Sequence, residues 1–223
     1  MSNTFWGMEI TAEQLLIGFG DTLYMVTVSL LFSALIGLPL GILLVITRKG
    51  HILDNTWVFN FLNPIINILR SVPFIILLVA IIPLTRIIAG SAIGTTAAIV
   101  PLVFYAAPYI ARLVENSLLE VDKGIIEAAQ SMGATVPQII FKFLIPEGLS
   151  SLILTFTTAT IGLVGASAMA GAVGAGGVGD LAITYGYQRF DTMTMIVTVA
   201  ALVIIVQILQ STGNMVSKQI RRR

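Results

Sequence analysis

The sequence contains no cysteine, a single histidine and few charged residues. The lack of cysteine excludes disulfide bonds and thiolate metal sites, and it leaves the redox state of the compartment unreadable. We expect the lone histidine, His51, to be a solvated loop residue rather than a metal ligand. Charged residues make up 10% of the 223 residues, whereas a soluble domain carries roughly 25%. The net charge of +1 is too small to indicate a nucleic-acid partner.

The sequence also lacks a nucleotide-binding motif of the P-loop type. No GxxxxGK[ST] occurs, so we expect no ATP site in this chain, and no cofactor or metal. Residues 174–179 fit GxGxxG, but that pattern indicates a dinucleotide site only between a strand and a helix. Here it follows an apolar run. We predict a loop in which one backbone approaches another closely, because glycine has no side chain.

Long apolar runs dominate what is present. Hydrophobic residues make up 57% of the sequence, and a hydrocarbon core about 30 Å thick needs roughly 20 of them in a helix. The predicted fold class is therefore an all-α integral membrane protein with five transmembrane helices. The predicted spans cover residues 23–46, 58–82, 93–110, 149–169 and 192–210. Residues 1–20 are expected to form an extracytoplasmic segment before a membrane domain at 21–223.

Basic residues predict the orientation, because short cytoplasmic loops carry an excess of Lys and Arg. One side of the predicted membrane domain has only Arg86 and Arg189. The other side has Arg48, Lys49, Arg112, Lys123, Lys142, Lys218, Arg221, Arg222 and Arg223. We therefore expect the N-terminus outside, the C-terminus in the cytoplasm, and a cytoplasmic segment between the third and fourth spans.

One charge falls inside a predicted span. Arg70 lies well within residues 58–82 and is followed by Pro73. Charged residues inside membranes are expensive and usually serve a function. Two interpretations stay open: a charge buried against protein or reaching polar groups, and a bend at Arg70 and Pro73 that moves during a transport cycle.

The cytoplasmic segment at residues 127–146 has the pattern of two helices separated by a tight break. Glu127 to Met132 favours a short helix that ends at Gly133, the residue type that best adopts the left-handed conformation. Thr135 then offers a cap for a second helix, with Gln138 three residues later as its capping-box partner. The two alanines after Glu127 leave one face with little bulk, so another surface can approach it.

These residues resemble a known family. The spacing of Glu127, Ala128, Ala129, Gly133 and Pro146 is similar to the EAA loop of permease subunits in binding-protein-dependent ABC importers. In the family pattern EAA is followed by three residues, Gly, nine residues and I-x-L-P. The chain departs from this ending only in its two apolar positions, which hold Phe and Ile and keep the apolar character.

Further stretches resemble the methionine-import permeases of that family, over nearly the whole chain after about residue 21. They are Arg70 to Leu78, Ile99 to Leu102, Ala107-Pro108, Ile110 to Arg112, Val114 to Asn116, Gly165 to Gly179 and Gly186-Tyr187.

The resemblance implies a type I importer in the cell inner membrane and not an enzyme. A homodimer of this chain would pair with two copies of a cytoplasmic ATP-binding subunit, and an extracytoplasmic substrate-binding protein or lipoprotein would deliver methionine or a related small amino acid. By position, Glu127, Ala128, Ala129 and Gly133 would be the residues that couple to the ATPase. Met169, a large flexible residue after small ones, would be the pathway gate.

Two other functions stay open at this point. A self-sufficient secondary carrier or channel would need no ATPase, although such carriers commonly place acidic residues at the span centres, which this sequence does not. An osmolyte permease would share the EAA loop. The stretch from Ala168 to Gly179 favours methionine.

Overall fold

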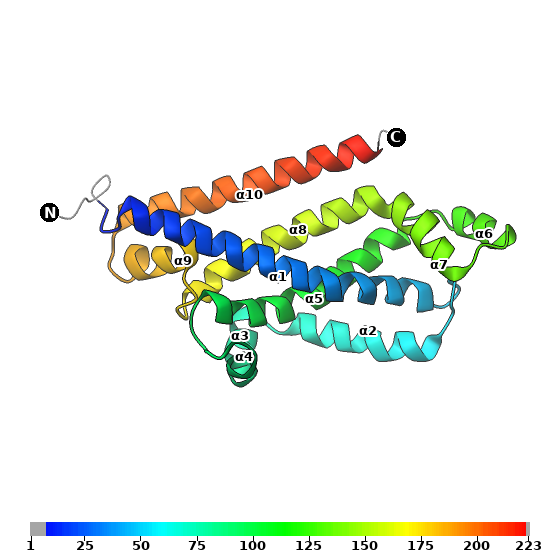
Figure 1. Cartoon of the computed structure of the whole chain (residues 1–223), viewed down its shortest axis with the longest axis horizontal. Coiled ribbons are helices and arrows are strands. Elements are labelled where there is room, and N and C mark those ends of the chain that lie inside the picture. The colour runs from blue at the N-terminus through cyan, green and yellow to red at the C-terminus, as the bar shows by residue number, and fades with distance from the viewer. Residues whose placement is uncertain (1–7, 222–223) are drawn as a thin grey trace.

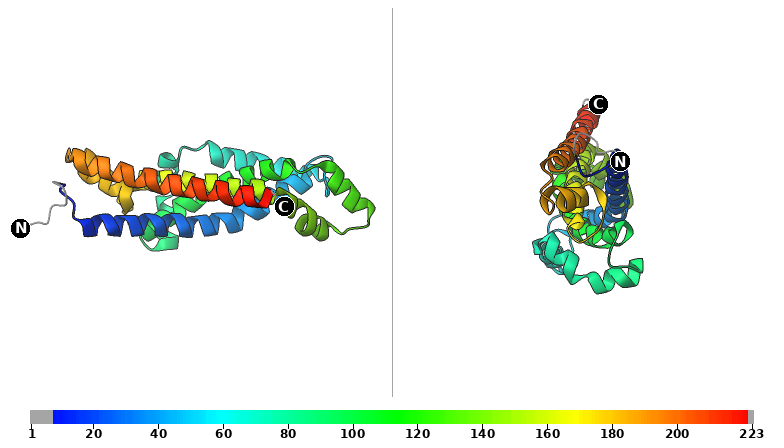
Figure 2. Two further views of the ribbon diagram at one scale, coloured as in Figure 1. Left: turned by 90° about the horizontal axis from the view of Figure 1, so that it is seen from above. Right: turned by 90° about the vertical axis from the view of Figure 1, so that its left-hand side faces the viewer.

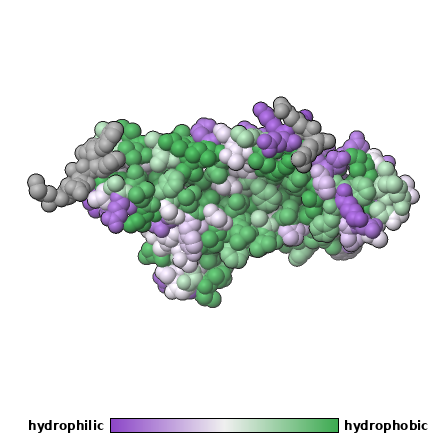
Figure 3. All heavy atoms as spheres, turned by 45° about the horizontal axis from the view of Figure 1, so that its top comes forward, coloured by the Kyte–Doolittle hydropathy of each residue, from purple (hydrophilic) through white to green (hydrophobic). Residues whose placement is uncertain are grey.

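The computed structural model describes residues 8–221, and every regular element within them is helical. Part of the expected N-terminal segment, and the basic residues Arg222 and Arg223, lie outside the described residues. The helices form an elongated bundle in which the long ones run nearly parallel to its long axis (Figure 1). Apolar side chains cover much of the face seen in Figure 3, and hydrophilic ones lie at both ends and along the upper edge. This distribution is the one that a chain crossing a bilayer requires.

The first long helix, α1 (Ala12–Thr47), begins earlier than the apolar run predicts. Thr11 caps it through a capping box with Gln14, and 36 residues give a length of about 54 Å. Residues 12–20, predicted to precede the first span, are therefore part of its helix. Met8 and Ile10 are fully buried beside Leu181. This contact holds the residues just before α1 against a much later segment of the chain.

The predicted second span is not one helix. The chain forms α2 (Thr56–Ser71), α3 (Phe74–Ala80) and α4 (Ile82–Ala89), and α2 and α3 meet at an angle of 99°. Pro73 explains the break, because proline has no amide hydrogen to donate and forces the preceding residue into an extended conformation. Val72 has φ −80° and ψ 122° accordingly. Seen end-on, α3 and α4 project from the bundle (Figure 2).

The remaining spans are longer than predicted. They are α5 (Thr95–Leu119), α8 (Ile145–Gly171) and α10 (Thr192–Arg221). Within the described residues, four helices are long and apolar enough to cross a membrane, and the bent pair α2–α3 makes a fifth if it counts as one span. The all-helical, multi-span prediction is confirmed. The span boundaries differ because helices continue into the polar zones beyond the apolar runs.

Short helices close the two ends of the bundle. At one end lie α6 (Lys123–Ser131), α7 (Val136–Ile139) and the π-helical turn η2 (Ile140–Leu144). At the other end lie α9 (Gly177–Leu181) and the π-helical η3 (Ala182–Tyr187) (Figure 1). The α6 end also receives the C-terminal ends of α1, α5 and α10. It therefore collects most of the basic residues.

The most extensive helix–helix contact in the bundle is between α1 and α5. A Cβ atom on Gly37 would lie 2.7 Å from the carbonyl oxygen of Ala107, and one on Gly41 would lie 2.6 Å from that of Ala111. Val114, fully buried, packs over Gly41. Small residues at this four-residue spacing let two membrane helices approach until their backbones touch. Helix α1 also passes through Pro39 without a break.

Replacing Gly41 should separate these two helices. Gly41→Val places atoms where the α5 backbone lies, and overpacking of this kind costs about 1–3 kcal/mol. We expect a lower midpoint temperature for aggregation of the purified protein, measured by size-exclusion chromatography after heating. Gly20→Val is the matched control, since Gly20 lies on the same helix and a Cβ atom placed on it would meet no atom within 4 Å. Equal midpoints for the two variants would contradict the packing argument.

Candidate functional site

The segment at 127–146 forms the two helices and the break that its sequence predicts. Helix α6 ends in a Schellman motif: the amide of Ala134 donates to the carbonyl of Ala129 at 3.0 Å, and the amide of Gly133 to that of Gln130 at 2.9 Å. Gly133 has φ 77°, in the left-handed region that favours glycine. A Cβ atom placed on it would meet no atom within 4 Å. The constraint at this position is therefore one of backbone conformation alone.

The two alanines face in different directions. Ala129 is fully buried, whereas Ala128 and Glu127 are exposed. Next to them, Met132 exposes 72% of its surface. The sequence predicts that the two alanines leave one helix face with little bulk. In the structure Ala129 packs into the protein, and only Ala128 remains on the exposed surface.

Helix α7 starts where the capping box predicts. The amide of Thr135 donates to the side-chain oxygen of Gln138 at 2.9 Å. From Val136 the chain then continues through η2 into α8, so that residues Val136–Gly171 form one helical stretch of 36 residues. In the sequence, the coupling segment and the fourth span are predicted as separate pieces. The structure joins them through the π-helical turn η2, with Pro146 just after it in the first turn of α8.

The other sequence candidates line one cavity. Arg70 and Pro73, at the break between α2 and α3, and Met169, on α8, border a space of about 470 Å³. The rings of Phe74 and Tyr105 lie across its wall, 5.3 Å apart in an edge-to-face arrangement. Residues that the sequence separates by almost 100 positions therefore meet at one place in the membrane domain.

Small residues on one face of helix α8 leave the space that forms this cavity. Gly162, Gly165, Ala166 and Met169 follow one another at three- and four-residue spacing, so they share a face of the helix. A Cβ on Gly165 would meet no atom within 4 Å. Met169 stands at the end of this small-residue face and exposes 55% of its surface. It is therefore the large side chain that can fill or free the space.

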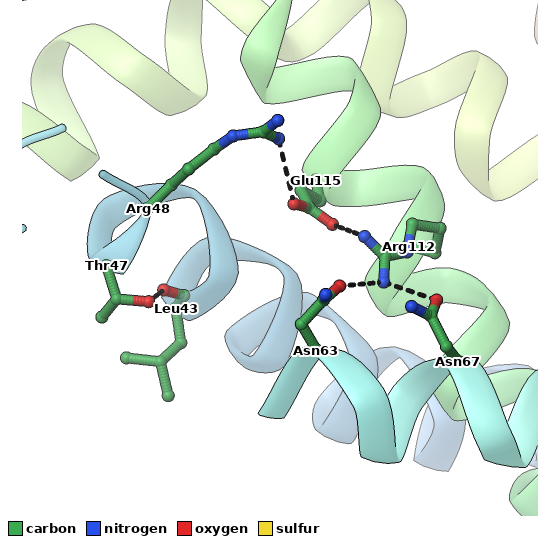
Figure 4. Close-up of polar contacts among 7 residues, drawn as sticks. All are labelled: Leu43, Thr47, Arg48, Asn63, Asn67, Arg112 and Glu115. Atoms are coloured by element: carbon green, nitrogen blue, oxygen red, sulfur yellow. Dashed lines mark hydrogen bonds and ion pairs between the residues drawn. The ribbon is translucent and has the colours of Figure 1, made fainter. Parts of the chain in front are cut away.

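An ion cluster holds three helices together (Figure 4). Glu115 on α5 exposes only 1% of its side chain and lies between two guanidinium groups. Arg48, just after α1, approaches it at 3.5 Å, and Arg112, one turn earlier on α5, donates to its other oxygen. Arg112 also donates to the side-chain oxygens of Asn63 at 2.6 Å and Asn67 at 2.7 Å on α2.

Removing one partner of such a buried cluster lowers the stability of the fold, because it leaves the other charge buried and unpaired. The cluster ties the end of α1, the middle of α2 and the end of α5 into one unit near α6. This cluster is not predicted from the sequence, because the third span is expected to end at residue 110, whereas α5 continues to Leu119. The spacing of Arg112 and Glu115, three residues apart on a helix, is the signal that predicts such a pair.

The glycine-rich run at 174–179 is a close-approach segment, as predicted. Gly179 packs so tightly on Ala168 of α8 that a Cβ atom there would overlap the backbone. The amide of Gly94 donates to the carbonyl of Gly174 at 3.1 Å, and the amide of Val178 to the hydroxyl of Thr22 at 2.9 Å. The run thereby joins α8 to α1 and α5. The absence of a strand in residues 8–221 removes the context that a dinucleotide site needs.

His51 is less exposed than predicted. It borders a small cavity of about 120 Å³ together with Lys123 and Glu127 of α6. Burial, and the positive charges of Lys123 and Arg48, lower the pKa of His51 below its usual value. The neutral form is thus favoured beside the helix that carries the EAA residues.

The opposite end of the bundle is held by polar contacts among the segments that meet there. Arg189 pairs with Glu9 at 3.4 Å and lies over the ring of Tyr185 at 4.4 Å. Asp191 accepts hydrogen bonds from the side chain and amide of Thr194 and from the amide of Glu9, and these lower the pKa of its carboxyl. These contacts fasten the start of the chain to the loop before α10.

Comparison with known proteins agrees with this geometry. Residues 37–222 match the family described as binding-protein-dependent transport system inner membrane component. The probable D-methionine transport system permease protein MetI of Vibrio cholerae is 48% identical over 96% of this chain and 95% of its own. The D-methionine transport system permease protein MetI of Escherichia coli K12 is 53% identical over 69% of this chain and 71% of its own.

Solved structures give the same result. A chain of the MetNI methionine ABC transporter in an inward-facing conformation superposes with a TM-score of 0.92 at 48% identity, over 94% of this chain and 97% of that one. An amino acid ABC transporter chain shares the fold at a TM-score of 0.76 and 17% identity, over 93% of this chain and 94% of that one. The family match covers most of the chain, and so does the similarity to the relatives. The chain therefore belongs to the family of inner membrane components of binding-protein-dependent transport systems.

Proposed function

We propose that this chain is the membrane-spanning permease subunit of an ATP-driven importer for methionine or a related small amino acid. Two copies form the translocation pathway and bind two copies of a separate cytoplasmic ATP-binding subunit, in which ATP is hydrolysed. A substrate-binding protein or lipoprotein delivers the amino acid from outside. The relatives' names support the substrate, since they are D-methionine transport system permease proteins and a chain of a methionine ABC transporter. The family description, which is of binding-protein-dependent transport, supports the binding-protein partner.

The end that carries α6 and α7 is the cytoplasmic one in this proposal, and the N-terminus lies outside. The distribution of basic residues supports this orientation, since Arg48, Arg112, Lys123, Lys142 and Lys218 all lie toward the α6 end. Glu127, Ala128, Ala129 and Gly133 then present the coupling surface to the ATPase.

The observation that carries the proposal is the continuity of α7 with α8. A stretch of helix that begins at the proposed docking surface ends beside the cavity that Met169 borders. Helices transmit displacement along their length, because their backbone hydrogen bonds resist stretching. Closure of the ATPase dimer against α6 and α7 would therefore move the wall of the cavity. The break at Pro73, on the other side of the cavity, is where the chain is able to bend.

The ion cluster at Glu115 has a mechanical role in this account. It fixes α1, α2 and α5 to one another close to the moving end. Helix α8 can then shift against a unit that stays rigid. Met169, whose flexible thioether side chain repacks easily, closes or opens the cavity as α8 moves.

The substrate and the energy source are tested together by uptake of labelled methionine. Cells that carry this chain with the ATPase and binding protein encoded beside it should accumulate methionine, and unlabelled methionine should compete better than other amino acids or an osmolyte such as betaine. Accumulation should stop when the ATPase is inactivated. Transport by the purified chain alone in liposomes, driven by an ion gradient, would instead support a secondary carrier and contradict the proposal.

The turn at Gly133 should be needed for coupling but not for membrane insertion. Gly133→Val forces a β-branched residue to positive φ, which costs roughly 1–2 kcal/mol, or about tenfold in an affinity. We expect weaker pull-down of the ATPase subunit and slower uptake at normal levels of the chain in the membrane. Gly133→Asn is the matched control, since asparagine tolerates this conformation. Normal pull-down and uptake by the valine variant would contradict a role of the turn in coupling.

Shortening the side chain at the proposed gate should open a leak. Met169→Ala removes the long side chain from the small-residue face of α8 that borders the cavity. We expect a several-fold increase in basal ATPase activity or in passive methionine leak from proteoliposomes of the complex. Met215→Ala serves as control, because Met215 is similarly exposed on α10 and does not border this cavity. Unchanged basal ATPase activity together with unchanged leak would contradict a gating role for Met169.

A further inference from the structure

Arg70 is a charge deep in the membrane domain. Helix α2 starts at Thr56, beside Trp57, which is 89% exposed and suits a membrane interface. Arg70 follows fourteen residues after Thr56, which places it about 21 Å further along the helix. That depth lies within a hydrocarbon core about 30 Å thick. In the single chain its side chain is exposed, on the face that borders this cavity.

The protein gives this charge no partner of opposite sign. Among the described residues the ion pairs involve Arg48, Arg112 and Arg189, and Arg70 donates no hydrogen bond to a side chain or to the backbone. Its position in the last turn of α2 is favourable for a cation, but the helix dipole offsets only part of the cost of a charge at this depth. A further anionic group is needed.

Among the described residues, no acidic side chain lines the cavity that Arg70 borders. Asp21 packs beside Gly176, and Asp180 accepts a hydrogen bond from Thr184 at 3.1 Å. Glu115 is already held by two arginines.

The cavity that Arg70 borders has the size and lining for a small amphipathic solute. Its volume of about 470 Å³ falls in the range of small-molecule sites. One side is cationic, whereas Phe74, Tyr105 and Met169 make most of the rest apolar or aromatic. An amino acid has a carboxylate that fits a guanidinium through two parallel hydrogen bonds. A thioether or other apolar side chain packs favourably against aromatic rings.

We propose that Arg70 binds the α-carboxylate of the amino acid while it passes through this cavity. The chain then contacts its substrate directly, and selection does not rest on the binding protein alone. The break at Pro73 serves this role, since it ends α2 at the cavity and leaves the guanidinium beside the open space. The inference rests on the proposed function, because it takes an amino acid as the solute.

The test uses the complete complex of permease, ATPase and binding protein in proteoliposomes. We expect Arg70→Gln to lower the methionine taken up per ATP hydrolysed at least tenfold, and Arg70→Lys, which keeps the charge, to lower it no more than threefold. Arg86→Gln is the control, since Arg86 is an exposed arginine on α4 that borders a different cavity. It should stay within twofold of the unchanged protein.

A second measurement reports binding without turnover. Methionine labelled with ¹³C at the carboxyl is added to the permease–ATPase complex in nanodiscs without binding protein, and its carboxyl resonance should broaden. The broadening should be lost in Arg70→Gln and kept in Arg70→Lys. Uptake per ATP by Arg70→Gln within twofold of the unchanged protein, or unaltered broadening, would overturn the inference. Failure of the unchanged complex to accumulate methionine would instead overturn the proposed function.

Discussion

The contact between α1 and α5 is the constraint on which the rest of the bundle depends. Two glycines on α1 meet backbone carbonyls of α5, so these helices lie closer together than side chains would allow. In a bilayer such contact matters more than apolar burial, because lipid tails are as apolar as the side chains they replace. The same interface ends at Glu115, where the half-exposed Arg48 after α1 pairs with this buried carboxylate on α5. Close packing and charge therefore fix the same pair of helices.

This rigid unit gives the moving parts something to move against. Helix α8 packs on α5 through hydrogen bonds such as that between Ser117 and Thr155, 2.7 Å apart, and it also reaches the proposed coupling end. The break in the long helices lies elsewhere, at the α2–α3 junction. The cavity lies between this break and α8. A bundle with one fixed interface and one bent junction is suited to alternate between states, since a packed interface is bistable rather than continuously deformable.

Two charged residues of the membrane domain, Glu115 and Arg70, differ in their partners. Glu115 is neutralised by two arginines and supported further by two asparagines bound to Arg112, so its cost is met within the fold. Arg70 borders an open cavity without a carboxylate among the residues that line it. The cluster around Glu115 stabilises the structure, whereas the guanidinium of Arg70 is left free to bind an anionic group. The difference in partners, rather than the depth of either charge, separates a structural group from one available to a solute.

Much of the candidate site follows from local sequence. Gly133 predicts the end of α6, because only a residue without Cβ takes positive φ easily, and Thr135 with Gln138 predicts the start of α7 through hydrogen bonds three residues apart. The early start of α1 is not predicted, since its cap at Thr11 lies in a polar stretch without the long apolar run by which spans are recognised. The 99° break is hidden within one predicted span because the apolar composition continues through it.

The sequence by itself determined the class of the protein: long apolar runs require helices in a bilayer, and short-range rules of capping and backbone conformation fix the turn at Gly133. Only the tertiary structure decided which residues meet. Arg70, Pro73 and Met169 share a cavity, and Arg48, Glu115 and Asn63 share a cluster, although each set is drawn from helices far apart in the chain. These contacts depend on how closely whole helices pack. The closeness is set by glycines and other small residues on the facing sides, and no local sequence pattern shows which of them face one another.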